Sequence, residues 1–166
     1  MGEPLFRNIE TAAALTGYTP TEEDLRGLRE WFETYDARSS DPTPENVERM
    51  ADMAVFPLNL VTDGSDGEPW TGQWDREQYV RTMNAVLGGE AGGDLSFESV
   101  RTPFFLSPSM AVVFSSSVMR AGGEEHRMNY ADILVRQEGG WVFQTMAQRG
   151  WADMLREQKQ KQEQAG

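Results

Sequence analysis

The segment from about residue 95 to residue 149 constrains the fold more than any other part of the sequence. Four stretches in it have the composition of β-strands, and only the short breaks SPS, AGGEE and EGG separate them. Connections of this length join antiparallel neighbours, because a parallel pair needs a crossover of about a dozen residues or more. We therefore expect a four-stranded antiparallel meander, with strands at about 95–106, 110–121, 126–137 and 141–149.

Helical signals dominate the first part of the chain. The stretch TPTEEDLRGLREWFETYDA offers Thr19 as an N-cap, Pro20 at the first helical position and Glu22 to complete a capping box. The apolar side chains that follow recur at helical spacing, at Leu25, Leu28, Trp31, Phe32 and Tyr35. The stretch SSDPTP ends this helix, and PENVERMADM predicts a second, shorter one.

A third helix, DREQYVRTMNAVL, is predicted after Asp75, because Asp75 can cap it and Gln78 stands at the capping-box position. Before it, AVFPLNLVT has the pattern of a strand, and Pro57 inside this strand indicates a sheet edge or a bulge. We expect the segment DGSDGEPWTGQ, residues 63–73, to be a loop, and GGEAGG, residues 88–93, to be a flexible break.

The order of these elements predicts one α+β domain. Three N-terminal helices should cover one face of a curved antiparallel sheet. A strongly curved sheet of this kind is a barrel-like cone, and the inside of such a cone is a natural apolar cavity. We assign the domain to residues 19–151, after a leader at 1–18 in which IETAAAL favours a short helix. The polar tail at 152–166 should begin as a short helix and fray.

Composition narrows the classes of function. The formal net charge of −12 argues against nonspecific binding to nucleic acid, which needs a basic surface. No apolar run approaches membrane-spanning length, and the lack of cysteine rules out thiolate chemistry and favours the cytoplasm. One histidine without cysteine offers no metal-ligand set, and no glycine-rich phosphate loop precedes a helix. We therefore expect neither a metal nor a cofactor.

Three segments resemble the nuclear-transport-factor-2-like (NTF2-like) superfamily, and within it the SnoaL-like polyketide cyclases and the ketosteroid isomerases. MADMAVF is similar to the family's passage from helix to strand, EPWTGQWDREQYV to its loop and third helix, and ADILVRQEGGWVFQTM to its final hairpin. The resemblance covers roughly residues 22–151. It implies the cone-shaped fold, a small hydrophobic organic ligand and a homodimer formed through the outer face of the sheet.

The same resemblance singles out Asp132. In both groups of enzymes a functional aspartate lies seven or eight residues before the hairpin glycine, and Asp132 lies seven before Gly139 and eight before Gly140. That group is a protonated acid of the oxyanion hole in the isomerases and the general acid/base in the cyclases. The general base of the isomerases has no counterpart here, because Leu58 stands near its place with neutral Asn59 beside it.

Other family features are also altered. The first-helix tyrosine of the isomerases falls near Trp31, with Tyr35 one turn later. The His–Asp pairing of the scytalone-dehydratase-like members is not evident, because His126 is the only histidine. The resemblance therefore does not imply steroid isomerisation by the usual groups.

Strand alternation puts Tyr130 and Asp132 on one face, in a stripe with His126, Met128 and Leu134. A carboxylate among apolar groups has a raised pKa, which suits proton transfer near neutral pH. Tyr130 can donate a hydrogen bond to a substrate oxygen, or it can be a packed aromatic residue.

Two alternatives remain open for Asp132 itself. It stands free in the cavity, or it forms a structural ion pair with an arginine of a neighbouring strand, for which the candidates are Arg101, Arg127 and Arg149.

The register of the final hairpin bears on this choice. A two-residue loop at Gly139–Gly140, which this dipeptide favours, sets Arg149 diagonal to Asp132. A three-residue loop instead brings Gln144 and Gln148 onto the face of Asp132.

Together these patterns predict a cofactor-independent cyclase, isomerase or dehydratase acting on a polyketide-like or other hydrophobic carbonyl compound. Asp132 is the expected acid/base, and Tyr130 or Asn59 is expected to polarise the carbonyl. The expected substrate-binding residues are Trp31, Tyr35, Asn59, Trp74, Arg101, His126, Gln144 and Arg149. The alternative is a non-catalytic ligand-binding or assembly module of the same fold.

The outer face of the sheet supports the expected dimer independently. Alternation assigns Val113, Ala131, Ile133 and Val135 to this face. A half-exposed apolar sheet usually finds a partner, so we expect association through it.

Overall fold

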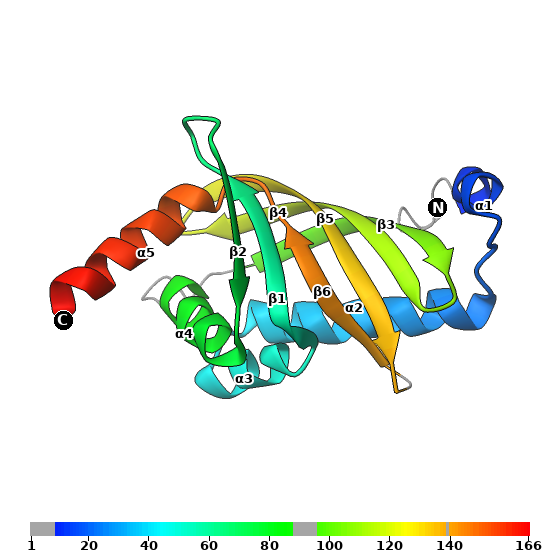
Figure 1. Cartoon of the computed structure of the whole chain (residues 1–166), viewed down its shortest axis with the longest axis horizontal. Coiled ribbons are helices and arrows are strands. Elements are labelled where there is room, and N and C mark those ends of the chain that lie inside the picture. The colour runs from blue at the N-terminus through cyan, green and yellow to red at the C-terminus, as the bar shows by residue number, and fades with distance from the viewer. Residues whose placement is uncertain (1–8, 88–95, 139) are drawn as a thin grey trace.

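A computed structural model describes residues 9–87, 96–138 and 140–166 of the chain (Figure 1). Its helices are α1 (Ile9–Thr16), α2 (Glu22–Ser40), α3 (Pro44–Ala51), α4 (Arg76–Leu87) and α5 (Ala152–Ala165). Its strands are β1 (Ala54–Asp63), β2 (Pro69–Trp74), β3 (Ser96–Ser107), β4 (Met110–Ala121), β5 (Glu124–Gln137) and β6 (Gly140–Ala147). The expected break at 88–93 lies outside the described residues.

The six strands form one sheet in the order β2-β1-β6-β5-β4-β3. Strands β3 to β6 are the antiparallel meander that the sequence predicts. The contact between β1 and β6 is parallel, so the sheet is mixed rather than wholly antiparallel. A parallel pair needs a long connection between its two strands, and here α4 and most of the meander lie between β1 and β6 in the sequence.

The prediction of a loop at residues 63–73 is wrong for its second half, which is a strand. Residues Pro69–Trp74 form β2, which pairs antiparallel with β1 from Leu58↔Trp74 to Asp63↔Pro69. Glycine and proline obscure the strand pattern here. Gly72 has a packing role, because a Cβ atom at this position would lie only 2.7 Å from the ring of Trp70.

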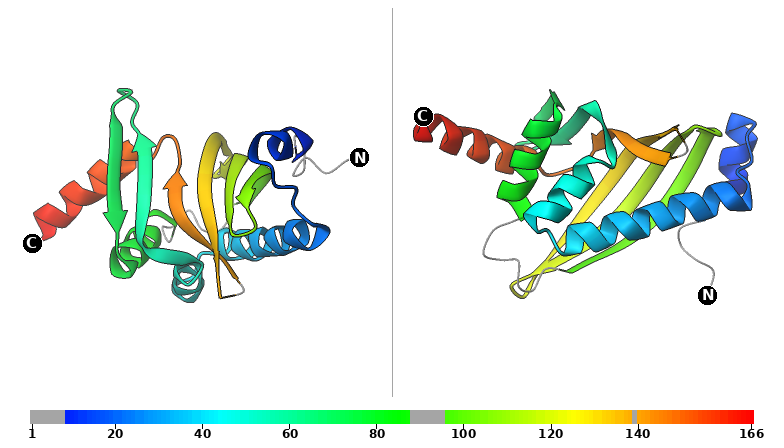
Figure 2. Two further views of the ribbon diagram at one scale, coloured as in Figure 1. Left: turned by 45° about the vertical axis from the view of Figure 1, so that its right-hand side comes forward. Right: turned by 90° about the horizontal axis from the view of Figure 1, so that it is seen from below.

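The three helices α2, α3 and α4 cover one face of the curved sheet, as expected. Figure 1 shows α2 running beneath the strands, with α3 and α4 grouped at one end. Seen from below, α2 crosses the strands diagonally on the concave side (Figure 2). The sheet stays open, with β2 and β3 as its two edges. The space between α2 and the concave face is therefore where a cavity can form.

The capping box of α2 starts two residues later than predicted. Thr21, rather than Thr19, is the N-cap, and Asp24, rather than Glu22, completes the box. The Asp24 amide donates to the Thr21 hydroxyl at 3.1 Å, and the Thr21 amide donates to the Asp24 carboxylate at 2.9 Å. Arg136 also binds Asp24, at 3.1 Å, which ties the helix start to the sheet.

The start of α4 has the expected reciprocal cap. The amide of Asp75 donates to the side chain of Gln78 at 3.0 Å, and the amide of Gln78 donates to the carboxylate of Asp75 at 2.8 Å.

Pro57 lies at a bulge in β1, which is one of the two alternatives that the sequence offers. The ladder between β1 and β6 shifts register between Ala54 and Asn59.

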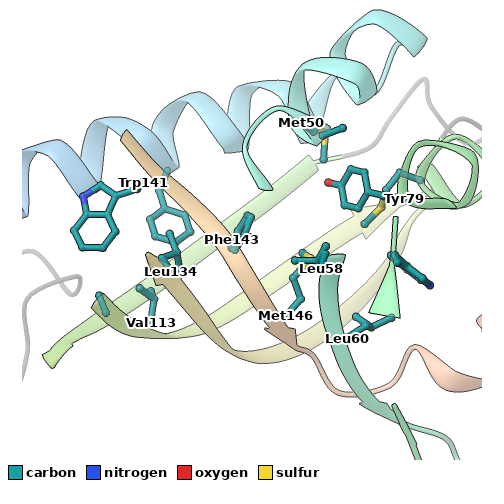
Figure 3. Close-up of a cluster of buried hydrophobic side chains, with 14 of the residues drawn as sticks. Met50, Leu58, Leu60, Tyr79, Val113, Leu134, Trp141, Phe143 and Met146 are labelled. Atoms are coloured by element: carbon teal, nitrogen blue, oxygen red, sulfur yellow. The ribbon is translucent and has the colours of Figure 1, made fainter. Parts of the chain in front are cut away.

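A continuous core joins the helices to the concave face (Figure 3). Phe143 of β6 stands at its centre and packs edge-on against Trp31, Phe32 and Tyr35 of α2, with ring centroids 4.8, 6.2 and 5.1 Å away. Val113 is fully buried in this core. The assignment of Val113 to the outer face is therefore wrong, because the alternation of β4 runs one residue out of step with it.

Helix α5 continues to Ala165, well beyond the short helix expected for the tail. It extends away from the sheet in Figures 1 and 2. None of the helices in the described part of the chain has the length and apolar character needed to cross a membrane.

Candidate active site

A cavity lies between the concave face of the sheet and helices α2, α3 and α4. Its walls come from Phe32, Tyr35, Asp36, Ser39, Met50, Met83, Leu87, Phe97, Ser99, Arg101, Ser115, Ser117, Tyr130, Asp132, Phe143, Gln148 and Trp151. The space open to the centre of a water-sized sphere is about 60 Å³, enough for roughly four waters. Including its open mouth, the unoccupied space is about 610 Å³. The cavity therefore suits a compound of about one ring.

A row of polar side chains crosses the cavity wall. Arg101 of β3 pairs with Ser115 of β4, Ser115 pairs with Tyr130 of β5, and Tyr130 forms a bridge to Gln148 beyond β6. Residues directly opposite each other in an antiparallel ladder point to the same face of the sheet. The wall is therefore polar along this line, which crosses several strands.

Asp132 lies beside this row, on the same face of β5 as Tyr130. It is 2% exposed, and its carboxylate accepts a hydrogen bond from Nε2 of Gln148 at 3.3 Å. Burial raises the pKa of Asp132 to about 7, against the opposing effects of Gln148, the positive charge of Arg101 and the backbone amide of Ala147. A carboxyl with this pKa takes up and releases a proton near neutral pH.

Arg101, an arginine of the cavity wall, already forms an ion pair with a carboxylate other than Asp132. Arg101 donates two hydrogen bonds to Asp36 of α2, at 2.6 and 2.7 Å. Its guanidinium also lies over the ring of Phe32, 4.2 Å from the ring centre. Within the described residues, Asp132 takes part in no ion pair. The free-carboxylate alternative therefore holds, and the three arginine pairings do not.

The hairpin register explains why. The last pair of the ladder is Gln137 with Gly140, one position earlier than the predicted Gly139–Gly140 loop allows. A bulge then shifts the ladder between Ile133 and Leu134. After the bulge, the side chain that reaches Asp132 is Gln148 rather than Arg149, as in the three-residue alternative. Gln144, the other residue of that alternative, lies on the outer face instead.

Two tyrosines of the cavity are neutral hydrogen-bonding groups. Burial raises the pKa of Tyr130 above its usual range, and burial raises the pKa of Tyr35 well above it. The hydroxyl of Tyr130 donates to Sδ of Met128 at 2.9 Å and accepts a hydrogen bond from the side chain of Trp151.

Trp151 is positioned by the turn that precedes α5. Gly150 has a φ of 93°, a conformation that favours glycine. The amides of Gly150 and Trp151 donate to Asp63 and Thr62 of β1, at 2.8 and 2.9 Å. These bonds hold the indole at the cavity wall.

Known proteins resemble the chain in fold alone. No protein-family model and no curated protein sequence matches it. Among solved structures, a candidate scytalone dehydratase from Novosphingobium aromaticivorans superposes with a TM-score of 0.57 at 20% identity, covering 76% of this chain and 83% of that one. LinA superposes with 0.56 at 12% identity, covering 74% and 82%.

An NTF2-like protein of unknown function from Pseudomonas putida gives a TM-score of 0.58 at 13% identity, again over 74% of this chain and 82% of that one. The chain has the NTF2-like fold. The α+β architecture expected from the sequence is thereby confirmed.

Within the NTF2-like fold, four of the residues expected at the site line the cavity: Tyr35, Arg101, Tyr130 and Asp132. Trp31 lies outside it and stacks on Tyr35, with ring centroids 5.9 Å apart. Trp74 is a core residue and borders a separate small void with Leu60.

The remaining four expected residues lie elsewhere on the fold. Asn59 and Gln144 border a depression on the outer face. His126 has a side chain that is 54% exposed, 3.5 Å from Glu124. Arg149 has a side chain that is 76% exposed, 3.9 Å from Asp63. The expectation that these four line the cavity is wrong, because β5 leaves the cavity before His126 and the hairpin bulge turns Arg149 outward.

Several wall residues were missed by the sequence analysis: Asp36, Ser115 and Trp151. Ser115 had a usable signal, because it alternates with Val113 and Ser117 along one strand. Asp36 and Trp151 had none, since only tertiary packing brings them to the cavity. In the described part of the chain, no cluster of three or more metal-ligating side chains occurs.

Proposed function

We propose that the protein is a cofactor-independent enzyme that moves a proton on a small carbonyl compound, as a cyclase, isomerase or dehydratase does. The observation that carries this proposal is the state of Asp132. The carboxylate is buried in a cavity wall, hydrogen-bonded by an uncharged amide and outside any ion pair of the described residues. Its pKa of about 7 lets it serve as base and then as acid in one cycle.

The substrate class follows from the size and polarity of the cavity. A compound of about one ring fits, and the neutral hydroxyl group of Tyr35 can donate a hydrogen bond to it. Asp132 takes a proton from a carbon next to the carbonyl and returns it at another atom. This role agrees with the acid/base function that the family resemblance implies for the same residue.

Hydrogen exchange tests the proposal without knowledge of the natural substrate. Acetophenone and cyclohexanone are incubated with the protein in D₂O, and deuterium uptake next to the carbonyl is followed by NMR. We expect the wild type to accelerate uptake, and Asp132→Asn to lose roughly two to four orders of magnitude of this acceleration. Asp52→Asn, a change at an exposed carboxylate, is the control. Equal rates for wild type and Asp132→Asn would contradict the proposal.

The second candidate is a non-catalytic binding or assembly module. The outer face of the sheet favours it, because large apolar side chains are exposed there: Val61, Val100, Leu106, Met110 and Phe114. Exposed apolar patches of this kind mark interaction sites. Carbonyl compounds that quench the fluorescence of Trp151 but show no enhanced exchange would favour this second function. Trp151→Phe is the control for the quenching, because Trp31 and Trp74, the reporters suggested by the sequence, lie outside the cavity.

The occupant that we propose for the outer face is a second copy of the chain. A two-fold axis through an apolar sheet brings the same patch of both copies together, so one surface suffices. A homodimer is also what the family resemblance implies. The cytoplasmic location expected from the lack of cysteine stays a prediction, which cell fractionation checks.

A further inference from the structure

Two donors in the cavity wall are buried and lack a hydrogen-bond partner among the residues that the structure describes. They are Nε of Arg101 and Oγ of Ser115. Arg101 is 9% exposed and Ser115 is 5% exposed, and both line the cavity that contains Asp132. Buried polar groups are nearly always hydrogen-bonded, so each exception requires an explanation. A ligand or an ordered water in the cavity would supply one.

The two donors are neighbours. Arg101 and Ser115 stand directly opposite each other in the ladder of β3 and β4, where Cβ atoms lie about 5 Å apart. The outer nitrogens of Arg101 are both bound to Asp36, and Phe32 supports the face of the guanidinium. The Nε–H group is therefore held in one direction, while the hydroxyl of Ser115 is free to rotate toward the same acceptor.

We propose that the Nε–H group of Arg101 and the hydroxyl of Ser115 together hold the carbonyl oxygen of the substrate. This inference rests on the proposed function. Asp132 takes the proton from the adjacent carbon, the C–H electron pair forms the C=C bond, and the π electrons of the carbonyl move onto its oxygen. The two donors then stabilise the anionic oxygen of the enolate, where charge develops during the reaction.

Charge balance assigns the substrate to neutral ketones rather than carboxylates. Asp36 already matches the charge of Arg101, so the described wall residues offer no surplus cation for a second anion beside Asp132. In the enolisation step the negative charge moves from Asp132 to the substrate oxygen, and the total charge of the cavity stays the same. A substrate carboxylate would instead add an uncompensated charge.

Nitrophenols test the oxygen subsite, because a bound phenolate resembles an enolate oxygen and absorbs at longer wavelength than the phenol. The protein used is Asp132→Asn, in which this side chain is neutral at every pH. The absorbance of the bound probe then gives the ratio of phenolate to phenol. We expect at least tenfold tighter binding of the phenolate. Adding Ser115→Ala should reduce this preference about tenfold, since a donor to the anion is lost.

Ser116→Ala is the matched control, because it removes a hydroxyl from the neighbouring position of β4 on the outer face. The phenolate preference should stay within twofold of that in the Asp132→Asn protein. Ser115→Ala should fold normally, since it removes a buried group that has no partner in the described part of the chain.

Several outcomes would overturn the subsite. Nitrophenols that bind only as neutral phenols, or an unchanged preference in the Ser115→Ala variant, would remove the oxygen subsite and leave the proposed function in place. The same follows if acetophenone binds and no nitrophenol does. If neither probe binds, the proposed function fails and the subsite fails with it.

Discussion

Gln148 reaches Asp132 where the β5–β6 ladder ends, with its Nε2 atom 3.3 Å from Oδ1 of the carboxylate. Both residues are buried, and the amide brings a donor without a positive charge. The effect of burial on the carboxyl therefore prevails over its hydrogen bonds, and the pKa of Asp132 rises to about 7. An arginine in the place of Gln148 would have favoured the charged form and lowered this pKa.

The raised pKa predicts a pH-dependent cost in stability. Asp132 titrates at about 7 in the folded chain against 3.8 in the unfolded chain. Between these values the folded state binds more protons, so the free energy of unfolding falls as the pH rises through this window. Asp132→Asn abolishes the titration and can still accept the hydrogen bond from Gln148. At pH 8 the variant should be more stable than the wild type, by at most about 4 kcal/mol.

Urea melts of both proteins at pH 5 and pH 8 check this. At pH 5 the difference should shrink to about 1.6 kcal/mol, because this pH lies only a little above the value of 3.8 at which Asp132 titrates in the unfolded chain. Asp52→Asn, at an exposed carboxylate, should show no comparable change between the two pH values. A variant that is several kcal/mol less stable at both pH values would mean that Asp132 serves as a structural anion, as expected for a broken buried pair.

Removing the amide of Gln148 should raise the pKa of Asp132 further. The hydrogen bond from Gln148 favours the charged carboxylate, so its loss in Gln148→Met leaves the effect of burial less opposed. A ¹³C NMR titration of the Asp132 carboxyl measures the shift directly, and the pH profile of deuterium exchange should move upward with it. Gln144→Met, the same change on the outer face, is the control and should leave the titration in place. A downward shift in Gln148→Met would refute this role of the amide.

Most of the fold could be predicted from periodicity and turn chemistry. The strands of the meander are long and alternate cleanly, and the reciprocal cap of Asp75 and Gln78 is a local signal. Strand β2 was missed because a short edge strand with Pro69 and Gly72 carries too little pattern. Its partner β1 is far better marked, and the pairing between them is tertiary information.

The site was only partly predictable, for a different reason. Asp132 and Tyr130 follow from alternation along one strand, which survives small errors in element boundaries. The neighbour of Asp132 depends on a one-residue register, and the bulge between Ile133 and Leu134 decides it. No sequence pattern predicts that bulge. The pair of Arg101 with Asp36 joins a strand to a helix 65 residues earlier, so no local rule connects them.

The bidentate pair of Arg101 and Asp36 should influence Asp132 from a distance. Asp36→Asn removes the charge that neutralises Arg101, and the guanidinium then favours the carboxylate of Asp132 more strongly. The pKa of Asp132 should fall, and the pH profile of activity should move down with it. The variant should also lose about 2 kcal/mol of stability, the usual contribution of hydrogen bonds to a charged group.

The matched control for this pair is Asp52→Asn. Asp52 binds Arg76 at 2.8 Å, but both side chains are about half exposed or more, at 68% and 45%. Exposed pairs contribute about 1 kcal/mol or less, so this variant should unfold almost as the wild type does. An NMR titration of Asp132 that is the same in Asp36→Asn and in the wild type would show that Arg101 exerts no effect on the carboxyl.

The outer face of the sheet should form the dimer, and Phe114 is the residue on which to test it. Its side chain is 51% exposed and lies edge-on to Phe104, with ring centroids 5.4 Å apart. In a two-fold dimer through this face, Phe114→Glu brings carboxylates of both copies into an apolar contact, which should weaken association at least about a hundredfold. The fold should survive, because the ring projects away from the core.

Light scattering at about 20 µM, well above the dissociation constants typical of stable dimers, should therefore report a dimer for the wild type and a monomer for Phe114→Glu. The control is Leu15→Glu, since Leu15 is even more exposed, at 82%, but belongs to α1 rather than to the sheet. It should remain a dimer. A monomeric wild type would remove the second copy as the occupant of this face. A dimer that Phe114→Glu leaves intact would place the contact on another surface.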